Sequence, residues 1–407
     1  MAVKLGKGKW AVKEDKLLAY NDNSGRFFNK EFDFSRGSNA TYVAKDGLIK
    51  TTASDVPRID FSDSTSGALL LENSSSNLIT YSEDISQSYW NKRNINVTAN
   101  DTISPDGTQN ASKITTFSTV PYLGNDNISL TTGNVYTISC FVKKGTNRWI
   151  RLSSVSSSSL GAWFDLDNNV VGTVNSISAS IENYGNGWYR ISNTITAISG
   201  SNQTFLGFSS SDGGTEVVGT GHTVFAWGLQ VEESSFATSY IPTSGSATSR
   251  SADVCNNSGS AQDFNSVEGV LYAEVAALAE QTLTRYITLS NGTSSNRIII
   301  YITGVGVIKF FVGVGGVTQA AKTVSGQTTT NFNKLAVSYK ENDMKFYLNG
   351  VKVHTDTSAL TFPVNTLNVI NFAASNGTSS PFFGKAKCLA VFKEALTDAE
   401  LTCLTTI

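Results

Sequence analysis

The feature that most limits the possible folds of this chain is a recurring pattern of short apolar runs separated by turn residues. The clearest example spans 344–354, where Asn349-Gly350 stands between two alternating segments. Asn-Gly is the strongest short-range hairpin signal, because both turn positions need a positive φ. Comparable runs occur at 135–142, 149–152, 188–191, 224–231, 286–289, 297–302, 309–312 and 335–339. Short strands at this spacing, with no helical period between them, predict an all-β fold.

Composition favours the same fold. Charged residues make up only 16% of the chain, against about 25% in a typical protein. The polar surface must therefore consist of Ser, Thr, Asn and Gly, and the short hydroxyl and amide side chains disfavour helices by competing for backbone hydrogen bonds. One short C-terminal helix is expected, because Thr397-Asp398-Ala399-Glu400 is a capping box and Leu396 and Leu401 have the spacing of a hydrophobic staple.

Charge and hydropathy exclude two classes of partner. The net charge is −2 and no Lys/Arg cluster is present, so we expect no nucleic-acid partner, which would require a basic stripe. No stretch approaches the roughly 20 apolar residues of a membrane span, and we expect no membrane partner. The residues from Met1 to Asp15 contain no apolar run of signal-peptide length.

The cysteines do not predict a metal site. Cys140, Cys255, Cys388 and Cys403 form no C-x-x-C pair, and only two histidines accompany them, so zinc is not expected. A disulfide between Cys388 and Cys403 would form only if the final helix packed on the last strand. The low cysteine density fits assembly in a reducing cytoplasm.

The pattern divides the chain into three segments. Residues 1–80 consist of short, broken extended pieces, too short for a core of their own, and we expect them to pair with something else. Residues 81–245 form a first sandwich, in whose last strand Phe225, Trp227, Leu229 and Val231 are expected on one face. A linker at 244–249 then leads to a second sandwich at 250–407.

Three passages carry a family resemblance. The pieces from Phe34 to Leu78, including Ala40-Thr41-Tyr42-Val43 and Leu69-Leu70-Leu71-Glu72, resemble the opening of phage structural and tail-fibre-type proteins. The runs at 185–190, 227–233 and 238–243 resemble the carbohydrate-binding-module jelly rolls of those proteins. The runs at 346–350 and 390–401 resemble the laminin-G, concanavalin-like lectin fold.

The resemblance implies an architecture and a role. It implies an extended N-terminal virion-docking segment (1–80), a jelly roll (81–245) and a concanavalin-like β-sandwich (250–407). The expected function is that of a non-enzymatic phage virion structural protein, a tail fibre, head fibre or capsid decoration, assembled in the host cytoplasm. The expected partners are other virion proteins through residues 1–80, further copies of the chain, with a trimer favoured, and surface glycans.

Two alternatives remain open, a polysaccharide-degrading tail enzyme and a secreted bacterial adhesin. Glycoside hydrolysis needs two carboxyl groups that flank one bond. Glu232 and Glu233 are adjacent, so on a strand they point to opposite faces. We therefore expect no catalytic residues, and the missing export signal disfavours an adhesin.

Candidate ligand-binding residues cluster in the first sandwich. An aromatic ring can stack on the apolar face of a sugar while polar side chains bond the hydroxyls. The glycan-binding candidates on this basis are Trp149, Trp163, Arg151, Asp165 and Tyr189. Asp165, Asp167 and Asn169 lie in a turn with clustered oxygens and are candidates for a structural calcium. No other cofactor is expected.

Overall fold

The structure is a computed structural model that describes residues 11–13, 16–20, 27–63, 65–125, 128–154, 160–198, 204–214, 218–280 and 283–407. These residues form two compact units. The central unit comprises residues 38–51 and 74–251, and the C-terminal unit comprises the described residues up to Gly37 together with 52–73 and 252–407. Both are built from antiparallel β-sheets, which confirms the predicted all-β fold.

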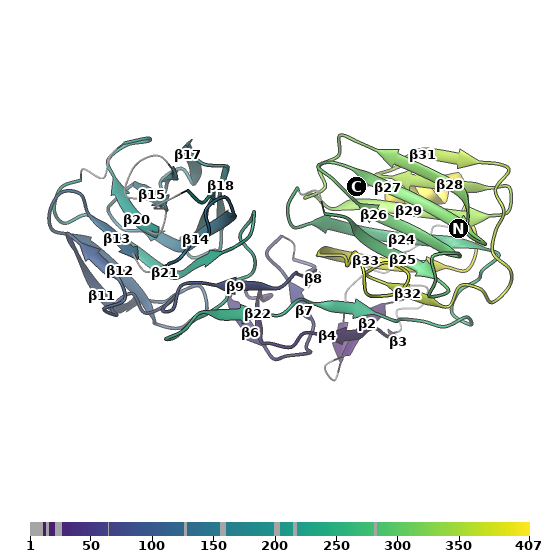
Figure 1. Ribbon diagram of the computed structural model, residues 1–407, viewed down its shortest axis with the longest axis horizontal. Helices are drawn as coiled ribbons and strands as arrows, with labels where there is room; N and C mark the ends of the chain where they lie inside the picture. Colours follow the sequence, from purple (N-terminus) through teal and green to yellow (C-terminus); the bar gives the residue numbers. More distant parts are fainter. Residues whose placement is uncertain are drawn as a thin grey trace. The chain divides into compact units, whose positions relative to one another are not determined.

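The central unit is a sandwich of two six-stranded sheets. The first sheet has the order β10 (Asn91–Arg93), β13 (Tyr122–Asn125), β20 (Thr204–Ser209), β15 (Trp149–Ser153), β16 (Gly161–Asp165) and β17 (Val170–Val174). The second has the order β11 (Ile95–Thr102), β12 (Ala111–Thr116), β21 (Thr223–Glu232), β14 (Val135–Lys144), β19 (Trp188–Thr196) and β18 (Ser178–Asn183). The chain crosses repeatedly between the two sheets (Figure 1). Apolar side chains of both sheets fill the space between them.

A β-bulge in β21 overturns the prediction that its four large apolar side chains share one face. Opposite Phe141 lies Trp227, but opposite Ser139 lies Gln230, so β21 has one extra residue in this interval. Gly228 occupies the bulge with φ 64°, and a Cβ there would lie 2.8 Å from the Phe141 ring. Because an extra residue shifts the alternation, Leu229 and Val231 enter the core between the sheets. Phe225 and Trp227 pack on the opposite face.

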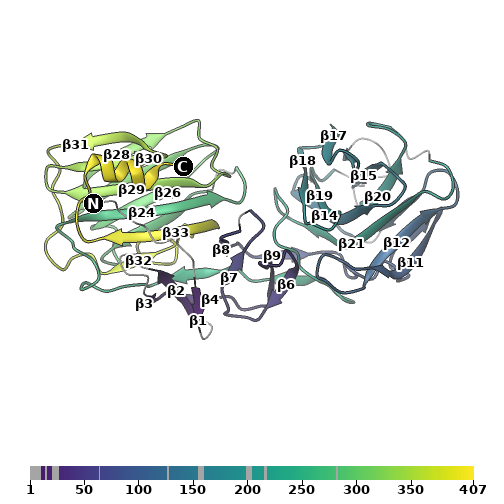
Figure 2. The same cartoon turned by 180° about the vertical axis from the view of Figure 1, so that it is seen from behind.

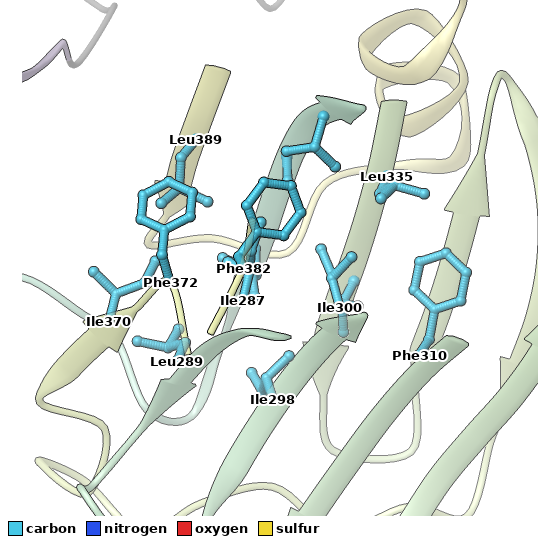
Figure 3. Packing of buried hydrophobic residues seen from close by; sticks show 14 of the residues in the cluster. Ile287, Leu289, Ile298, Ile300, Phe310, Leu335, Ile370, Phe372, Phe382 and Leu389 are labelled. Carbon is cyan, nitrogen blue, oxygen red and sulfur yellow. The ribbon is translucent and has the colours of Figure 1, made fainter. Parts of the chain in front are cut away.

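The C-terminal unit is a sandwich of a seven-stranded and a five-stranded sheet. The larger sheet has the order β31 (Val351–Asp356), β30 (Met344–Leu348), β29 (Asn333–Lys340), β24 (Glu268–Ala277), β33 (Gly384–Phe392), β8 (Ala68–Leu71) and β7 (Arg58–Asp60). The smaller has the order β28 (Val317–Val324), β27 (Ile308–Val314), β26 (Arg297–Ile302), β25 (Arg285–Ser290) and β32 (Val369–Asn371). Figure 3 shows side chains such as Ile300 and Phe310 meeting Leu335 in the core between them.

Two local predictions in this unit are confirmed. Asn349 and Gly350 have φ values of 49° and 82° and join β30 to β31. Helix α1 (Asp398–Thr405) begins with the predicted capping box, in which Thr397 and Glu400 bond each other's backbone. Figure 2 shows α1 on the outer face of the seven-stranded sheet, where Leu401 and Leu404 pack with Leu396 on Tyr272 and Tyr347.

Two further expectations concern the pairing of Cys388 with Cys403 and the presence of a membrane-spanning segment. Cys388 and Cys403 are both free thiols, so the conditional disulfide is not formed. Burial raises the pKa of the Cys140 thiol to about 12, which fits a packing role in the core. Among the described residues, no helix is long and apolar enough to cross a membrane.

The described part of residues 1–80 is divided between the two units instead of forming one segment. Strands β7 and β8 extend the seven-stranded sheet, and β4 (Asp33–Ser35) pairs with β23 (Val254–Asn256). In the central unit, β9 (Ser75–Asn77) pairs with β22 (Thr248–Arg250), and the hairpin of β5 (Ala40–Val43) and β6 (Ile49–Thr52) contributes Ile49 to the cluster around Trp227. A separate three-stranded sheet consists of β1 (Ala11–Lys13), β2 (Lys16–Tyr20) and β3 (Phe27–Glu31).

A buried ionic cluster connects the N-terminal pieces of the C-terminal unit to the later part of that unit. The Asp253 carboxylate accepts hydrogen bonds from Arg36 Nη1 at 3.1 Å, Arg58 Nη2 at 2.5 Å and the Glu72 backbone N–H at 2.8 Å. Arg58 Nη1 also donates to Glu72 Oε2 at 2.7 Å. The four side chains are 0–3% exposed. Burial alone would lower the pKa of Arg58, but Glu72 and Asp253 outweigh it and raise that pKa.

We predict that Asp253→Ala destabilises the C-terminal unit by roughly 3–5 kcal/mol, because it leaves buried guanidinium groups without their carboxylate. The matched control is Glu268→Ala, which removes a carboxylate of the same unit from a half-exposed ion pair with Lys340. Its expected cost is about 0–1 kcal/mol. Calorimetric unfolding of both variants measures the difference. Equal shifts in the two variants would contradict a special role for Asp253.

Candidate functional site

The outer face of the first sheet of the central unit brings together most of the predicted glycan-binding residues. Along β15, Ile150 and Leu152 point into the core. The alternate residues Trp149 and Arg151 therefore point outward. Across the hairpin, Trp149 pairs with Asp165 and Arg151 pairs with Trp163. Four of the five candidates thus share one sheet face, as two neighbouring cross-strand pairs.

One of the two pairs, Arg151 with Trp163, is fully buried and cannot stack on a ligand. Trp163 is 0% exposed, and its Nε1 donates a hydrogen bond to the Gly214 carbonyl at 2.9 Å. The Arg151 guanidinium lies 4.9 Å from the centre of the Trp163 ring. Gly161 makes room for it, since a Cβ there would lie 2.5 Å from Arg151 Nε. The prediction that Trp163 and Arg151 contact a glycan is therefore wrong, because they form a packed cation–π pair.

Asp165 holds a neighbouring arginine. Its carboxylate accepts hydrogen bonds from Arg148 Nε at 2.9 Å and Nη2 at 2.6 Å, and from Asn168 Nδ2 at 2.8 Å. The bonds from Arg148, helped by those from the 167–168 turn, keep the pKa of Asp165 well below its usual range. The carboxylate is buried, so its role is to fix Arg148, which lies 5.5 Å from the Trp149 ring centre.

The predicted calcium ligands are occupied by groups of the protein itself. The Asp167 carboxylate pairs with Lys144 and lies 3.8 Å from Arg148 Nε. Asn169 closes the turn with φ 58° and donates its N–H to the Asp165 carbonyl at 2.8 Å. Within the described ranges, no three His, Cys, Asp or Glu side chains are grouped to hold a metal. The turn is stabilised by cations and backbone amides at the places where calcium was expected.

The fifth candidate, Tyr189, lies away from the group. It is in β19, on the other sheet, opposite Val142 of β14. Its ring packs against the core between the two sheets. Tyr189 is therefore a partly buried packing residue on the other sheet, and the structure does not bring this glycan-binding candidate together with the other four.

Trp149 is the accessible tryptophan of this face. The other tryptophans of the described chain, Trp90, Trp163, Trp188 and Trp227, are at most 3% exposed, whereas Trp149 is only partly buried. Its ring lies against Gly172, where an added Cβ would come 2.7 Å from Cζ3. The glycine keeps the ring close to the sheet.

An exposed carboxylate completes the site. Asp212 lies beside the same glycine, and a Cβ on Gly172 would collide with both Asp212 and Trp149. Asp212 Oδ1 accepts a hydrogen bond from the Thr173 N–H at 2.6 Å, which fixes its position. Trp149 thus has both a cationic donor, Arg148, and an anionic acceptor, Asp212, close to it. This set can stack on a sugar ring and bond its hydroxyls.

Sequence reasoning missed Asp212 and the role of Gly172. Asp212-Gly213-Gly214 is recognisable as a turn, but nothing local shows that this turn reaches the face of β15 and β16. The same face extends to Tyr122, which pairs with Gly207 of β20 and has the Arg93 guanidinium 5.6 Å from its ring centre.

We predict that acid weakens the central unit through Asp165. Its pKa is lower in the folded state than the ordinary value of 3.8, so its contribution is complete above that pH and is lost as the pH falls through the folded pKa. Asp165→Asn should lower the thermal stability near pH 7 and reduce the further loss between about pH 4 and pH 2. Tryptophan fluorescence during thermal unfolding at several pH values measures both effects. An unchanged acid profile in Asp165→Asn would contradict this assignment.

Comparison with solved structures finds several remote matches, two of which contain a bound sugar. The CBM40 module of the Ruminococcus gnavus IT-sialidase, bound to α2,3-sialyllactose, is 19% identical, with 37% of this chain and 93% of that chain covered and a TM-score of 0.31. Domain 4 of the arabinanase AbnA from Geobacillus stearothermophilus, in complex with arabinotriose, is 17% identical, covers 38% and 73%, and has a TM-score of 0.29. A heptameric pentraxin of Limulus polyphemus is 13% identical, covers 34% and 69%, and has a TM-score of 0.28.

No curated protein sequence matches this chain. A family model does match part of the C-terminal unit, in agreement with the concanavalin-like sandwich predicted for residues 250–407. The matched part includes the strands from β25 to β33 and most of helix α1. Residues 272–402, about a third of the chain, match the concanavalin A-like lectin/glucanases superfamily.

Proposed function

We propose that this chain is a non-enzymatic carbohydrate-binding protein of a bacteriophage particle. The observation that carries the carbohydrate-binding part is Trp149, a partly exposed tryptophan that lies against Gly172 with Arg148 and Asp212 nearby. Aromatic rings flanked by a few fixed polar groups are the usual means of binding a small polar ligand with apolar faces. The lectin-type family match of the C-terminal unit supports the same class of function.

The bound sugar at Trp149 is proposed to be neutral. Arg148 is the cation nearest to the ring, and its charge is already balanced by Asp165. Asp212, which lies beside Gly172, adds a negative charge near the ring, and this charge would repel an anionic sugar. Hydroxyl groups, in contrast, can donate to Asp212 and accept from Arg148.

The proposal of a non-enzymatic role is supported by the state of the adjacent glutamates. Glu232 is fully buried and accepts hydrogen bonds from Ser75, Gln230 and Thr238. Glu233 faces the other side of the strand end and bonds Asn134 and Tyr136. The two carboxylates therefore cannot flank one glycosidic bond. The alternative, a polysaccharide-degrading enzyme, predicts release of reducing ends from a bound polysaccharide.

The virion part of the proposal rests on the resemblance of residues 34–78 and 185–190 to phage structural proteins. Strands β4, β8 and β9 pair with strands from later parts of the chain, and β7 pairs with β8, whereas among the described residues β1, β2 and β3 pair only with one another. We therefore assign the docking role to the part of the chain before Asp33. In this proposal the chain is a fibre or decoration protein that forms homo-oligomers, with a trimer favoured, because β-rich fibres bury exposed edges between protomers.

We predict that Trp149→Ala weakens binding of the full chain to its best neutral ligand on a glycan array at least about fivefold, since aromatic stacking contributes on the order of 1 kcal/mol. The control is Tyr42→Ala, which removes another partly buried aromatic ring of the central unit, on β5. Equal binding by wild type and Trp149→Ala, with both variants folded, would contradict the site.

We predict that the protein is a component of intact phage particles. Mass spectrometry of particles purified through a density gradient should detect the protein. High-salt washing should not reduce the number of copies per particle. A variant lacking residues 1–31 should be absent from the particles, while its two units still unfold cooperatively. Particles that never contain the full chain would end the virion proposal and leave the glycan site untouched.

A further inference from the structure

The outer face of the five-stranded sheet of the C-terminal unit carries a second set of aromatic and cationic side chains. Figure 3 shows Ile287, Ile298, Ile300 and Phe310 on the inner face of this sheet. Strand alternation therefore places a second set on the outer face. That set, which we call the β25–β27 face, consists of Tyr286, Arg297, Tyr301, Lys309 and Phe311, all partly exposed.

These side chains form two neighbouring groups. In the first, Tyr286 pairs with Tyr301, which pairs with Lys309 across the next strand. The two tyrosine rings meet edge to face at 4.9 Å, and Lys309 Nζ lies 5.8 Å from the Tyr301 ring centre. The first group is thus a row of two rings and one cation across three strands.

The second group lies further along the same strands. The Arg297 guanidinium is 5.2 Å from the centre of the Phe311 ring. Arg297 pairs with Gly313, and a Cβ on that glycine would lie 2.9 Å from Phe311. The missing side chain therefore lets the Phe311 ring lie close to the sheet. Arg297 and Tyr301 are four residues apart on one strand, roughly 13 Å at 3.3 Å per residue.

The polar groups of this face have no partner within the described part of the chain. Arg297 and Lys309 make neither a hydrogen bond nor an ion pair there, and the hydroxyls of Tyr286 and Tyr301 make no hydrogen bond. Arg297 Nε is also shielded from solvent without an acceptor. Several cations elsewhere are paired with carboxylates; examples are Arg36, Arg58, Arg148, Lys345, Lys352 and Lys385.

All charged side chains in the strands of this five-stranded sheet are cationic. Its five strands contain Arg285, Arg297, Lys309 and Lys322 but no Asp or Glu. A face of this kind is complementary to an anion. A second copy of the same chain would place one cationic face against another in a two-fold interface, and the like charges would repel.

We propose that the β25–β27 face is a second carbohydrate site, specific for acidic polysaccharides that carry carboxylate or sulfate groups. Sugar rings stack on Tyr301 and Phe311, while Arg297 and Lys309 bind the anionic groups. Arginine is suited to this task because its fork matches a carboxylate or sulfate with two parallel hydrogen bonds. The site is independent of Trp149, which belongs to the other unit.

The test is titration of the full chain with dextran sulfate, polygalacturonate and neutral dextran. We expect binding of at least one charged polysaccharide and none of neutral dextran. The double variant Arg297→Gln/Lys309→Gln should weaken that binding at least about tenfold, because two charge-assisted contacts are lost. Tyr301→Ala should weaken it several-fold without changing the net charge. Trp149→Ala should leave it unchanged, which separates this site from the proposed neutral-glycan site.

The matched control is Lys45→Gln/Lys143→Gln, which removes the same charge from the central unit. An equal loss in both double variants would show general electrostatic attraction and overturn the proposal, as would binding of neither charged polysaccharide. Tighter binding of single-stranded DNA than of either polysaccharide would also overturn it. So would a wild-type dimer that becomes monomeric only in Arg297→Gln/Lys309→Gln, because the face would then be an interface between copies.

Discussion

The carboxylate of Asp253 joins parts of the chain that are far apart in sequence. It binds Arg36, Arg58 and the backbone of Glu72, which are 217, 195 and 181 residues away. Both arginines are buried and have lost their hydration. The attraction to this carboxylate offsets that cost for each of them. The position of Arg58 and Glu72 in turn sets β7 and β8 on the edge of the seven-stranded sheet. The C-terminal sandwich is therefore completed by strands from the beginning of the chain.

Local signals in the sequence predict the elements that depend on local interactions. The Asn349-Gly350 hairpin and the capping box before helix α1 require only neighbouring residues, and both are present. The β-bulge at Gly228 could not be predicted in this way, because it is defined by the register between β21 and β14. The division of residues 33–80 between two units likewise depends on partners more than 150 residues away.

In the candidate site, too, the sequence predicts only what neighbouring residues define. That Trp149 lies near Asp165, and Arg151 near Trp163, follows from a hairpin between 149–153 and 161–165. The burial of Trp163 depends on Gly214, about 50 residues further on, and the supporting role of Asp165 depends on the direction taken by Arg148. On the β25–β27 face, the runs at 297–302 and 309–312 predict the strands. Which aromatic and cationic side chains lie together there depends on the register between the strands, which no local signal defines.

The pairing of the arginines distinguishes the two proposed sites. At Trp149, Arg148 is held by the buried Asp165 and the exposed Asp212 lies near the ring, so the charge of Arg148 is already compensated. On the β25–β27 face, Arg297 and Lys309 lie on aromatic rings with no carboxylate on any of the five strands. A bound anion would supply the missing acceptor and lose little to competition from the protein. Similar aromatic surfaces on the two sandwiches would thus select ligands of different charge, because one arginine already has an acidic partner and the other does not.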